Sequence, residues 1–297
     1  MLVSEVVDRT YSEYLYPAGI NRPAFDSLNG AILAADETIE LSGRLTNVPR
    51  DSILEIEDEL VLVEATSGSS ITVAERGFRE TAAADHADDT RVLLNPTFSR
   101  KVVFNAMNSI LSMLWPWGVY ERATADETAD ITSVMSLPEG GKDGPYNILV
   151  RLSGPNEKYH RLSRARQDYF IYREFDPPKY QLLKGVPNGS TITIVFAKEV
   201  AQAAAMADDL DTLGVSASLQ PYLPMGIAGQ LLQGREVPRT QIEDIRRALA
   251  SQGVQLPPGA TLSVGTALLR GFREVYVAAE RKRLNELDPP QMEFVGR

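Results

Sequence analysis

The sequence has no cysteine and only two histidines. The absence of cysteine excludes disulfide bonds, zinc sites built from thiolates, and cysteine nucleophiles. His86 and His160 are far apart in the sequence, and neither has a second ligand at the spacing of a metal-binding helix. No G-x-S-x-G motif is present to position a catalytic serine. We therefore expect no catalytic residue, no metal and no cofactor, and we predict that the chain is not an enzyme.

Long apolar runs and an excess of positive charge are also missing. No apolar stretch approaches the ~20 residues needed to cross a bilayer. Residues 1–9 include Glu5 and Asp8 where a secretion signal would be basic and then apolar, so we expect neither secretion nor membrane insertion. The formal net charge is −10. Because binding to nucleic-acid phosphates draws on clustered Lys and Arg, this charge argues against a protein that grips DNA or RNA.

The charge is unevenly distributed along the chain. Residues 1–97 are strongly acidic, whereas residues 145–200 carry more basic than acidic side chains. Opposite patches of neighbouring copies could therefore face one another. An acidic surface that only keeps the protein soluble explains the same charge equally well.

The composition and the periodicities predict a folded chain with alternating helical and β segments. The 297 residues are 43% hydrophobic and 24% charged, which is enough for a sizeable core. Apolar residues recur at helical spacing in residues 3–16, 99–114 and 261–287. A capping box at Thr240 and Glu243 starts a further helix. Strand-like spacing is punctuated by Gly, Pro and Ser turns, and it covers residues 36–95 and 129–199.

These segments predict an α+β fold with a helical bundle core. The core would combine the N-terminal, middle and C-terminal helices, from residues 1–35, 96–128 and 200–297. A small all-β insertion would occupy residues 36–95. A larger antiparallel β-sandwich or barrel domain would occupy residues 129–199.

Two motifs that could bind phosphate or metal ions are better explained by local structure. The first is a loop between strands, and the second is a solvated helix end or a turn. Gly140-Gly141-Lys142 lacks the preceding glycine and the following hydroxyl of a phosphate-binding loop, and we interpret it as a loop between strands. A cluster of carboxylates could hold a hard cation, but it lacks the ligand ladder and the central glycine of a calcium loop. Its members are Asp208, Asp209 and Asp211.

One short basic run contrasts with the rest of this acidic chain, and it contains Arg161, Arg164 and Arg166. Arginine forks recognise carboxylates and phosphates in pairs. The run could be a subunit contact, a DNA-facing loop or an ordinary exposed turn. Of the two functional interpretations we favour the subunit contact, because a single short patch is a weak footprint for DNA. The polar C-terminal tail carries isolated apolar residues that a partner could bury, namely Met292, Phe294 and Val295.

Residues 55–87 resemble a pattern that is frequent in structural proteins of tailed bacteriophages. The pattern begins with a strand, which here covers residues 55–63, and continues with a Gly/Ser hairpin at residues 67–70. An Arg-Gly segment at residues 76–77 then leads to a Thr-Ala-Ala-x-His-Ala turn at residues 81–87. The resemblance implies a virion protein.

This chain departs from the usual form of the pattern at residues 78–80 and by one additional residue before His86. The same pattern occurs in tail and baseplate proteins. By itself it therefore indicates a virion protein rather than a position in the virion.

The order of the remaining parts is similar to that of head-to-tail adaptor proteins, which sit beneath the portal. That order is an N-terminal helix, a small β insertion, a helix, a β-sandwich and closing helices. The resemblance implies a ring, usually of twelve subunits, in the virion neck, with synthesis in the host bacterial cytoplasm. The implied partners are further copies of the chain, the portal protein, and a tail or stopper protein. The C-terminal tail would dock on the portal, and no catalytic residue carries over.

The ring would surround a channel through which double-stranded DNA passes without specific binding. Acidic residues that face such a channel repel the DNA backbone, so the negative charge suits a lumen. Two other functions stay open at this point. The chain could be another tail component, such as a stopper, tail-tip or fibre-attachment protein. A carbohydrate-active enzyme with an accessory β domain is less favoured, because the sequence shows no reactive centre.

Overall fold

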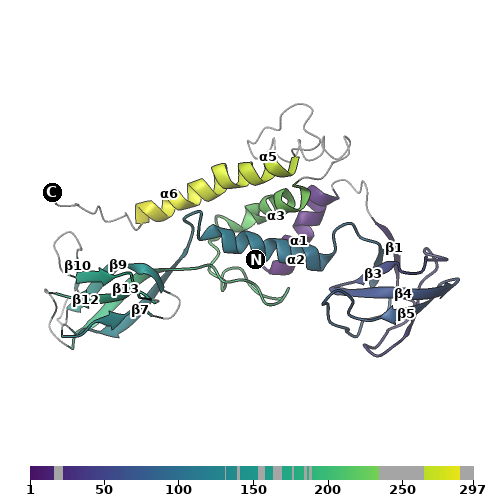
Figure 1. The fold of residues 1–297 in the computed structure, drawn as a ribbon, viewed down its shortest axis with the longest axis horizontal. Helices are drawn as coiled ribbons and strands as arrows, with labels where there is room; N and C mark the ends of the chain where they lie inside the picture. The colour runs from purple at the N-terminus through teal and green to yellow at the C-terminus, as the bar shows by residue number, and fades with distance from the viewer. Residues whose placement is uncertain are drawn as a thin grey trace. The chain divides into compact units, whose positions relative to one another are not determined.

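The computed structural model describes residues 1–16, 23–130, 132–138, 141–152, 158–162, 169–175, 177–183, 186, 189–233 and 264–287. The chain divides into two compact units, which we describe separately (Figure 1). Val7–Met107 with Ile227–Ala267 is called the half-barrel unit. Met1–Val6 with Asn108–Gly226 and Leu268–Arg297 is called the two-sheet unit.

The half-barrel unit is built on one curled antiparallel sheet of six strands in the order β1-β6-β3-β4-β5-β2. The two ends of this order meet at an isolated antiparallel bridge between Leu28 and Leu41. Beside it, the Ser42 N–H donates to the Ser27 carbonyl at 2.9 Å. The sheet therefore curls around its own core. Its strands are β1 (Ala24–Ser27), β2 (Thr38–Glu40), β3 (Ile53–Ile56), β4 (Glu59–Ser67), β5 (Ser70–Glu75) and β6 (Arg91–Leu94).

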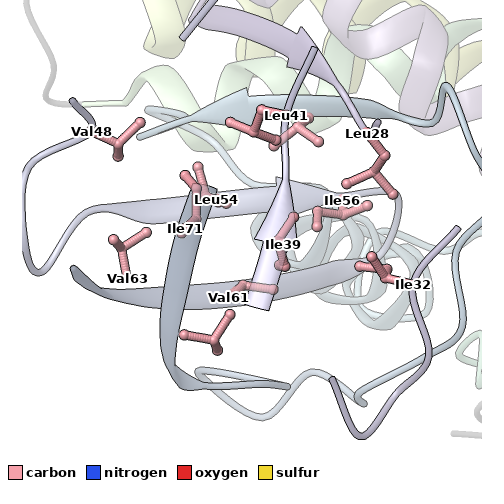
Figure 2. Packing of buried hydrophobic residues seen from close by; sticks show 12 residues of the cluster. Leu28, Ile32, Ile39, Leu41, Val48, Leu54, Ile56, Val61, Val63 and Ile71 are labelled. Atoms are coloured by element: carbon pink, nitrogen blue, oxygen red, sulfur yellow. The ribbon is translucent and has the colours of Figure 1, made fainter. Parts of the chain in front are cut away.

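Apolar side chains from these strands fill the inside of the half-barrel (Figure 2). Tight hairpins set their register. The β4–β5 turn contains Gly68 at a φ of +65°, which glycine adopts without a steric penalty. The β3–β4 turn places Glu57 at a φ of +52°. The buried positions include Ile39, Leu54, Ile56, Val61, Val63 and Ile71.

The two-sheet unit contains two antiparallel sheets that share one core. The larger has the order β10-β9-β13-β7, and β9, β13 and β7 lie side by side in Figure 1. The smaller has the order β11-β12-β8. Ile192 and Ile194 of the larger sheet pack in one cluster with Tyr180 and Leu182 of the smaller. The strands are β7 (Glu121–Thr128), β8 (Met135–Ser136), β9 (Gly141–Leu152), β10 (Lys158–Leu162), β11 (Tyr169–Tyr172), β12 (Lys179–Leu182) and β13 (Thr191–Lys198).

The described helices are short. Ser99 caps α2 as its sequence predicts, because its hydroxyl oxygen accepts the Val102 N–H at 3.3 Å. None of the described helices is both long enough and apolar enough to cross a membrane. The helices are α1 (Val3–Thr10), which continues as a π-helix (Tyr11–Leu15), α2 (Arg100–Leu114), α3 (Leu223–Leu232) after a 3-10 turn (Gln220–Tyr222), α5 (Val264–Gly271), a π-helix (Phe272–Val277) and α6 (Ala278–Leu287).

The predicted helical bundle core is wrong. The chain is α+β, and its clearest element is the curled six-stranded half-barrel. Within the described residues, α1 has 8 residues and α2 has 15, whereas bundle helices must be long enough to pack lengthwise over several turns. The half-barrel and the pair of sheets each contain a cluster of buried apolar residues of their own, so the β segments are not insertions in a helical core.

A π-helical segment changes which side of the C-terminal helix is buried. A 3.6-residue period places one apolar stripe along the helix that is predicted at residues 261–287, with the members Val264, Leu268, Phe272, Val275, Tyr276 and Ala279. Because a π-helix contains more residues per turn, the buried positions after Phe272 shift to Val277, Glu280 and Leu284. Val275 is left 45% exposed. The helical run therefore buries a different and partly polar face from the one that the 3.6-residue period predicts.

Candidate functional site

The half-barrel unit contains a cavity of about 750 Å³, which is within the size range of small-molecule sites. Residues from the first helical segment, from the β3–β4 hairpin, from β6 and from the start of α2 line it. Four of these residues are acidic and two are basic. The lining residues are Asp8, Tyr11, Ser12, Tyr16, Pro23, Glu55, Glu57, Asp58, Thr90, Arg91, Leu93 and Arg100.

Glu55 is the buried acid of this cavity, with only 2% of its surface exposed. It lies on β3 between two core residues, so the strand holds it rigidly. Its Oε1 accepts a short hydrogen bond from the backbone N–H of Arg100, the first residue of α2. Its Oε2 is buried and has no hydrogen-bond partner among the described residues. Burial raises the pKa of Glu55 from 4.5 to about 7, although the hydrogen bond and charge of Arg100 oppose the rise.

The guanidinium of Arg100 forms ion pairs with two carboxylates at the rim of the cavity. Its Nε donates to Asp58 at 2.8 Å and its Nη1 donates to Asp8. Both carboxylates are largely exposed, so each contact contributes little to stability by itself. Arg100 therefore donates its side-chain hydrogen bonds to Asp58 and Asp8, and Oε2 of Glu55 receives none of them, although the charge of Arg100 still acts on Glu55.

Two tyrosines form an aromatic part of the cavity lining. The rings of Tyr11 and Tyr16 are stacked, with centroids 5.6 Å apart and planes 6° from parallel. The Tyr11 hydroxyl donates to the carbonyl of Phe98 at 2.9 Å, which fixes its orientation. Burial raises the pKa of both phenols, so they stay neutral at physiological pH.

A second buried carboxylate, Glu59, lies within residues 55–87 and joins several parts of that segment. Glu59 on β4 is 1% exposed on its side chain and receives a bidentate ion pair from Arg76, with Nε–Oε1 at 2.7 Å and Nη2–Oε2 at 2.9 Å. The backbone N–H groups of Gly77 and Ala84 donate to it as well, at 3.0 and 3.1 Å. His86 Nε2 lies 2.8 Å from Oε2. We call these five residues the Glu59 clip.

The Glu59 clip ties the Arg-Gly segment and the His turn to β4. Although burial raises the pKa of Glu59, hydrogen bonds from Arg76, His86 and two backbone N–H groups lower it to about 2. The second nitrogen of His86, Nδ1, lies 2.9 Å from Glu57 Oε2. Both ring nitrogens are thus engaged, which makes His86 a structural residue.

The three-stranded sheet of the two-sheet unit exposes an aromatic face. Phe170 is 52% exposed, and its ring packs edge-on against Tyr172 with centroids 4.9 Å apart. Phe175 is 43% exposed, beneath the Lys179 ammonium at 4.3 Å from the ring centroid. Leu183 is 49% exposed. We call Phe170, Tyr172, Phe175 and Leu183 the aromatic face.

Most residues of the predicted contact sites lie outside the described residues. This applies to Arg164 and Arg166, and to the tail residues Met292, Phe294 and Val295. Arg161 lies on β10, where its backbone pairs with Leu149 of β9. The capping box at Thr240 and Glu243 also lies outside the described residues. The predicted contact sites therefore stay predictions.

The structure contradicts the interpretation of one of the two possible phosphate or metal motifs and agrees with that of the other. Gly141 and Lys142 begin β9, so the interpretation as a loop between strands is wrong for them. The Asp208 side chain accepts the N–H groups of Ala204 and Ala205 at 2.7 and 2.9 Å, and Asp209 accepts that of Asp211 at 3.0 Å. These carboxylates stabilise a turn, as the sequence predicts. In the part of the chain that the structure describes, no group of three or more His, Asp and Glu side chains could hold a metal ion.

Sequence reasoning missed the cavity and its central acid. The available signal was a single acidic residue, Glu55, inside the otherwise apolar strand segment Ile53–Ile56. His86 was assigned to a turn, but its burial and its two glutamate contacts were not foreseen. Comparisons of the chain with models of protein families, with curated proteins and with solved structures found no match.

Proposed function

We propose that the chain is a virion structural protein, a head-to-tail adaptor that forms a ring under the portal, joins capsid to tail and surrounds the DNA channel. The observation that carries the proposal is the aromatic face, in a chain whose residues 55–87 resemble virion proteins. Clustered exposed aromatics are typical of protein interfaces, where they supply most of the binding energy. The partners would be further copies, the portal protein and a tail or stopper protein.

The Glu59 clip supports an interpretation of residues 55–87 as a rigid structural module. Its buried ion pair and backbone hydrogen bonds leave the Glu59 carboxylate fully engaged with its own chain. A catalytic acid or base needs free access to a substrate proton. The clip instead fixes the shape of a loop, which suits a subunit that must fit its neighbours.

The charge of the chain supports a lumen that does not retain DNA. The net charge of −10 is repeated in every subunit of a ring. A negative lumen repels the phosphate backbone, so double-stranded DNA passes without specific binding. A ring of more than two subunits also needs two different complementary surfaces on each copy, because an isologous contact closes at the dimer and only a heterologous contact continues around a ring. The aromatic face is a candidate for one of them.

Mass photometry of the purified chain, alone and mixed with its cognate portal, tests the proposal. We expect rings or portal-bound complexes from the wild-type chain. The double variant Phe170→Ser, Leu183→Ser should lose them, because it removes two exposed apolar side chains. Leu33→Ser is the matched control, since Leu33 is 61% exposed and lies in the half-barrel unit. Circular dichroism checks that each variant is folded.

Three outcomes would contradict the proposal or its interface. A trimer that does not bind the portal would indicate another tail component. A monomer that hydrolyses glycans would indicate an enzyme. Rings that form equally well from the double variant would exclude the aromatic face as the contact while leaving the adaptor function in place.

A further inference from the structure

One oxygen of Glu55, Oε2, is buried in the half-barrel unit without a hydrogen-bond partner among the described residues, and we call it the open oxygen. A buried carboxyl oxygen without a partner is costly, because it has lost its water and gained no replacement. Oε1 of the same group is satisfied by the Arg100 N–H at the start of α2. Oε2 is buried, unpartnered among the described residues, and belongs to a residue that lines the 750 Å³ cavity. A ligand in the cavity could supply the missing partner.

The charges around the cavity favour a cation as that ligand. Asp8, Glu57 and Asp58 add carboxylates to the lining. The nearer of the two basic residues, Arg100, already donates to Asp58 and Asp8. The other, Arg91, lies over the ring of Phe25, with its Cζ 4.7 Å from the centroid. Among the described residues, neither guanidinium donates a hydrogen bond to Oε2, although the charge of Arg100 partly offsets that of the carboxylate.

The aromatic part of the lining selects among cations. A guanidinium is planar and weakly hydrated, stacks on aromatic rings and donates to carboxylates through a fork of N–H groups. An ammonium is compact and strongly hydrated, so it loses more on entering a site with little water. The stacked Tyr11 and Tyr16 rings supply the flat apolar surface that a guanidinium prefers.

We propose that this cavity binds a guanidinium group through the open oxygen of Glu55 and the rings of Tyr11 and Tyr16. The group could be carried by a small molecule or by an arginine side chain of a protein. Binding places a positive charge beside the carboxyl, so Glu55 ionises when the ligand enters. With a pKa of about 7 in the free protein, Glu55 releases about half a proton at pH 7. This inference does not depend on ring assembly.

Isothermal titration calorimetry of the full chain with methylguanidinium, against methylammonium, tests the site. Titrations at pH 7 in two buffers of different ionisation enthalpy give the number of protons exchanged. We expect methylguanidinium to bind at least tenfold more tightly than methylammonium and to release protons. Glu55→Gln should weaken methylguanidinium at least tenfold and abolish the proton release. Glu64→Gln is the matched control, because Glu64 is exposed and lies outside the cavity lining.

A synthetic peptide of residues 158–168, which carries the arginine run, distinguishes the two sources of the group. Tighter binding of the peptide than of methylguanidinium indicates a protein arginine, and equal or weaker binding indicates a small molecule. Proton uptake by the wild-type chain on binding methylguanidinium, or equal affinity of the wild-type chain for the two small cations, would overturn the proposal without any measurement on the variant. Unchanged methylguanidinium affinity in a folded Glu55→Gln variant would overturn it as well.

Discussion

The substitution Glu55→Gln should stabilise the half-barrel unit, and the gain should grow with pH. Glu55 has a pKa of about 7 in the folded protein and an ordinary value of 4.5 when unfolded. A carboxyl whose pKa is raised on folding binds its proton more tightly in the folded state. Its contribution to stability is therefore complete below pH 4.5 and is lost as the pH rises through 7. Glutamine keeps an acceptor oxygen for the Arg100 N–H and cannot ionise.

The size of the effect follows from the two pKa values. Each tenfold difference in proton affinity corresponds to about 1.4 kcal/mol, so ionisation of Glu55 costs the folded state about 3 kcal/mol at pH 8. At pH 5 the same calculation gives about 1 kcal/mol. The stability difference between Glu55→Gln and the wild type should therefore increase by about 2 kcal/mol from pH 5 to pH 8.

Hydrogen exchange of half-barrel amides, measured by mass spectrometry at pH 5, 6, 7 and 8, reports this difference for one unit of the chain. Exchange rates are corrected for the intrinsic pH dependence, and Glu64→Gln serves as the exposed control. Other titrating groups are common to both proteins and cancel in the comparison. A difference that stays constant from pH 5 to pH 8 would refute the assignment of a raised pKa to Glu55.

Two further predictions concern the Glu59 clip and the segment of residues 55–87 that contains it. Glu59→Gln should destabilise the half-barrel unit by about 3 kcal/mol at pH 7, because it leaves the Arg76 charge buried without its carboxylate. Since the pKa of Glu59 is lowered to about 2, this loss should shrink as the pH falls from 4.5 towards 2, and urea unfolding at pH 7 and pH 3 checks both the size and the sign. Gly77→Ala should lower the melting temperature far more than Gly68→Ala. Both glycines have a φ near +65°, but only at Gly77 would the new Cβ meet backbone, with the Thr81 carbonyl oxygen 2.8 Å away. Equal melting temperatures for the two variants would contradict the close approach at Gly77.

Local sequence patterns correctly predicted the elements that are stabilised by contacts between residues close in the sequence. The continuous apolar run Leu60–Val63 and the Gly/Ser turn at residues 67–70 predicted a hairpin, and the β4–β5 pair forms it. Ser99 and the following apolar stripe predicted a capped helix, which is α2. In these cases burial and hydrogen bonding follow directly from neighbours in the sequence.

Elements that depend on distant partners were missed. β1 consists of four residues, and its Phe25 is exposed. It forms because it pairs antiparallel with β6, with Ala24 opposite Leu94 and Ser27 opposite Arg91. No local period marks such a strand. The apolar stripe of the C-terminal helix was wrong for another reason. The π-helix at Phe272–Val277 changes which side chains face inward, and the 3.6-residue pattern does not reveal a π-helix.

The candidate site depends on tertiary contacts between distant segments, which the spacing of residues in the sequence does not predict. Glu55, Arg100 and Asp8 come from three separate segments, and their roles follow from which oxygen each donor reaches. The sequence did mark Glu55 as a lone acid in an apolar strand. Its unpartnered oxygen and its cavity emerged only from the fold.

The proposed function of the chain is to assemble into a ring around a channel. Negative-stain electron microscopy of the chain mixed with its cognate portal tests this claim most directly. End-on views should show a closed ring of identical subunits with an open centre, bound to one end of the portal. Portal particles that look the same with and without the chain, while the chain stays a monomer, would contradict the claim.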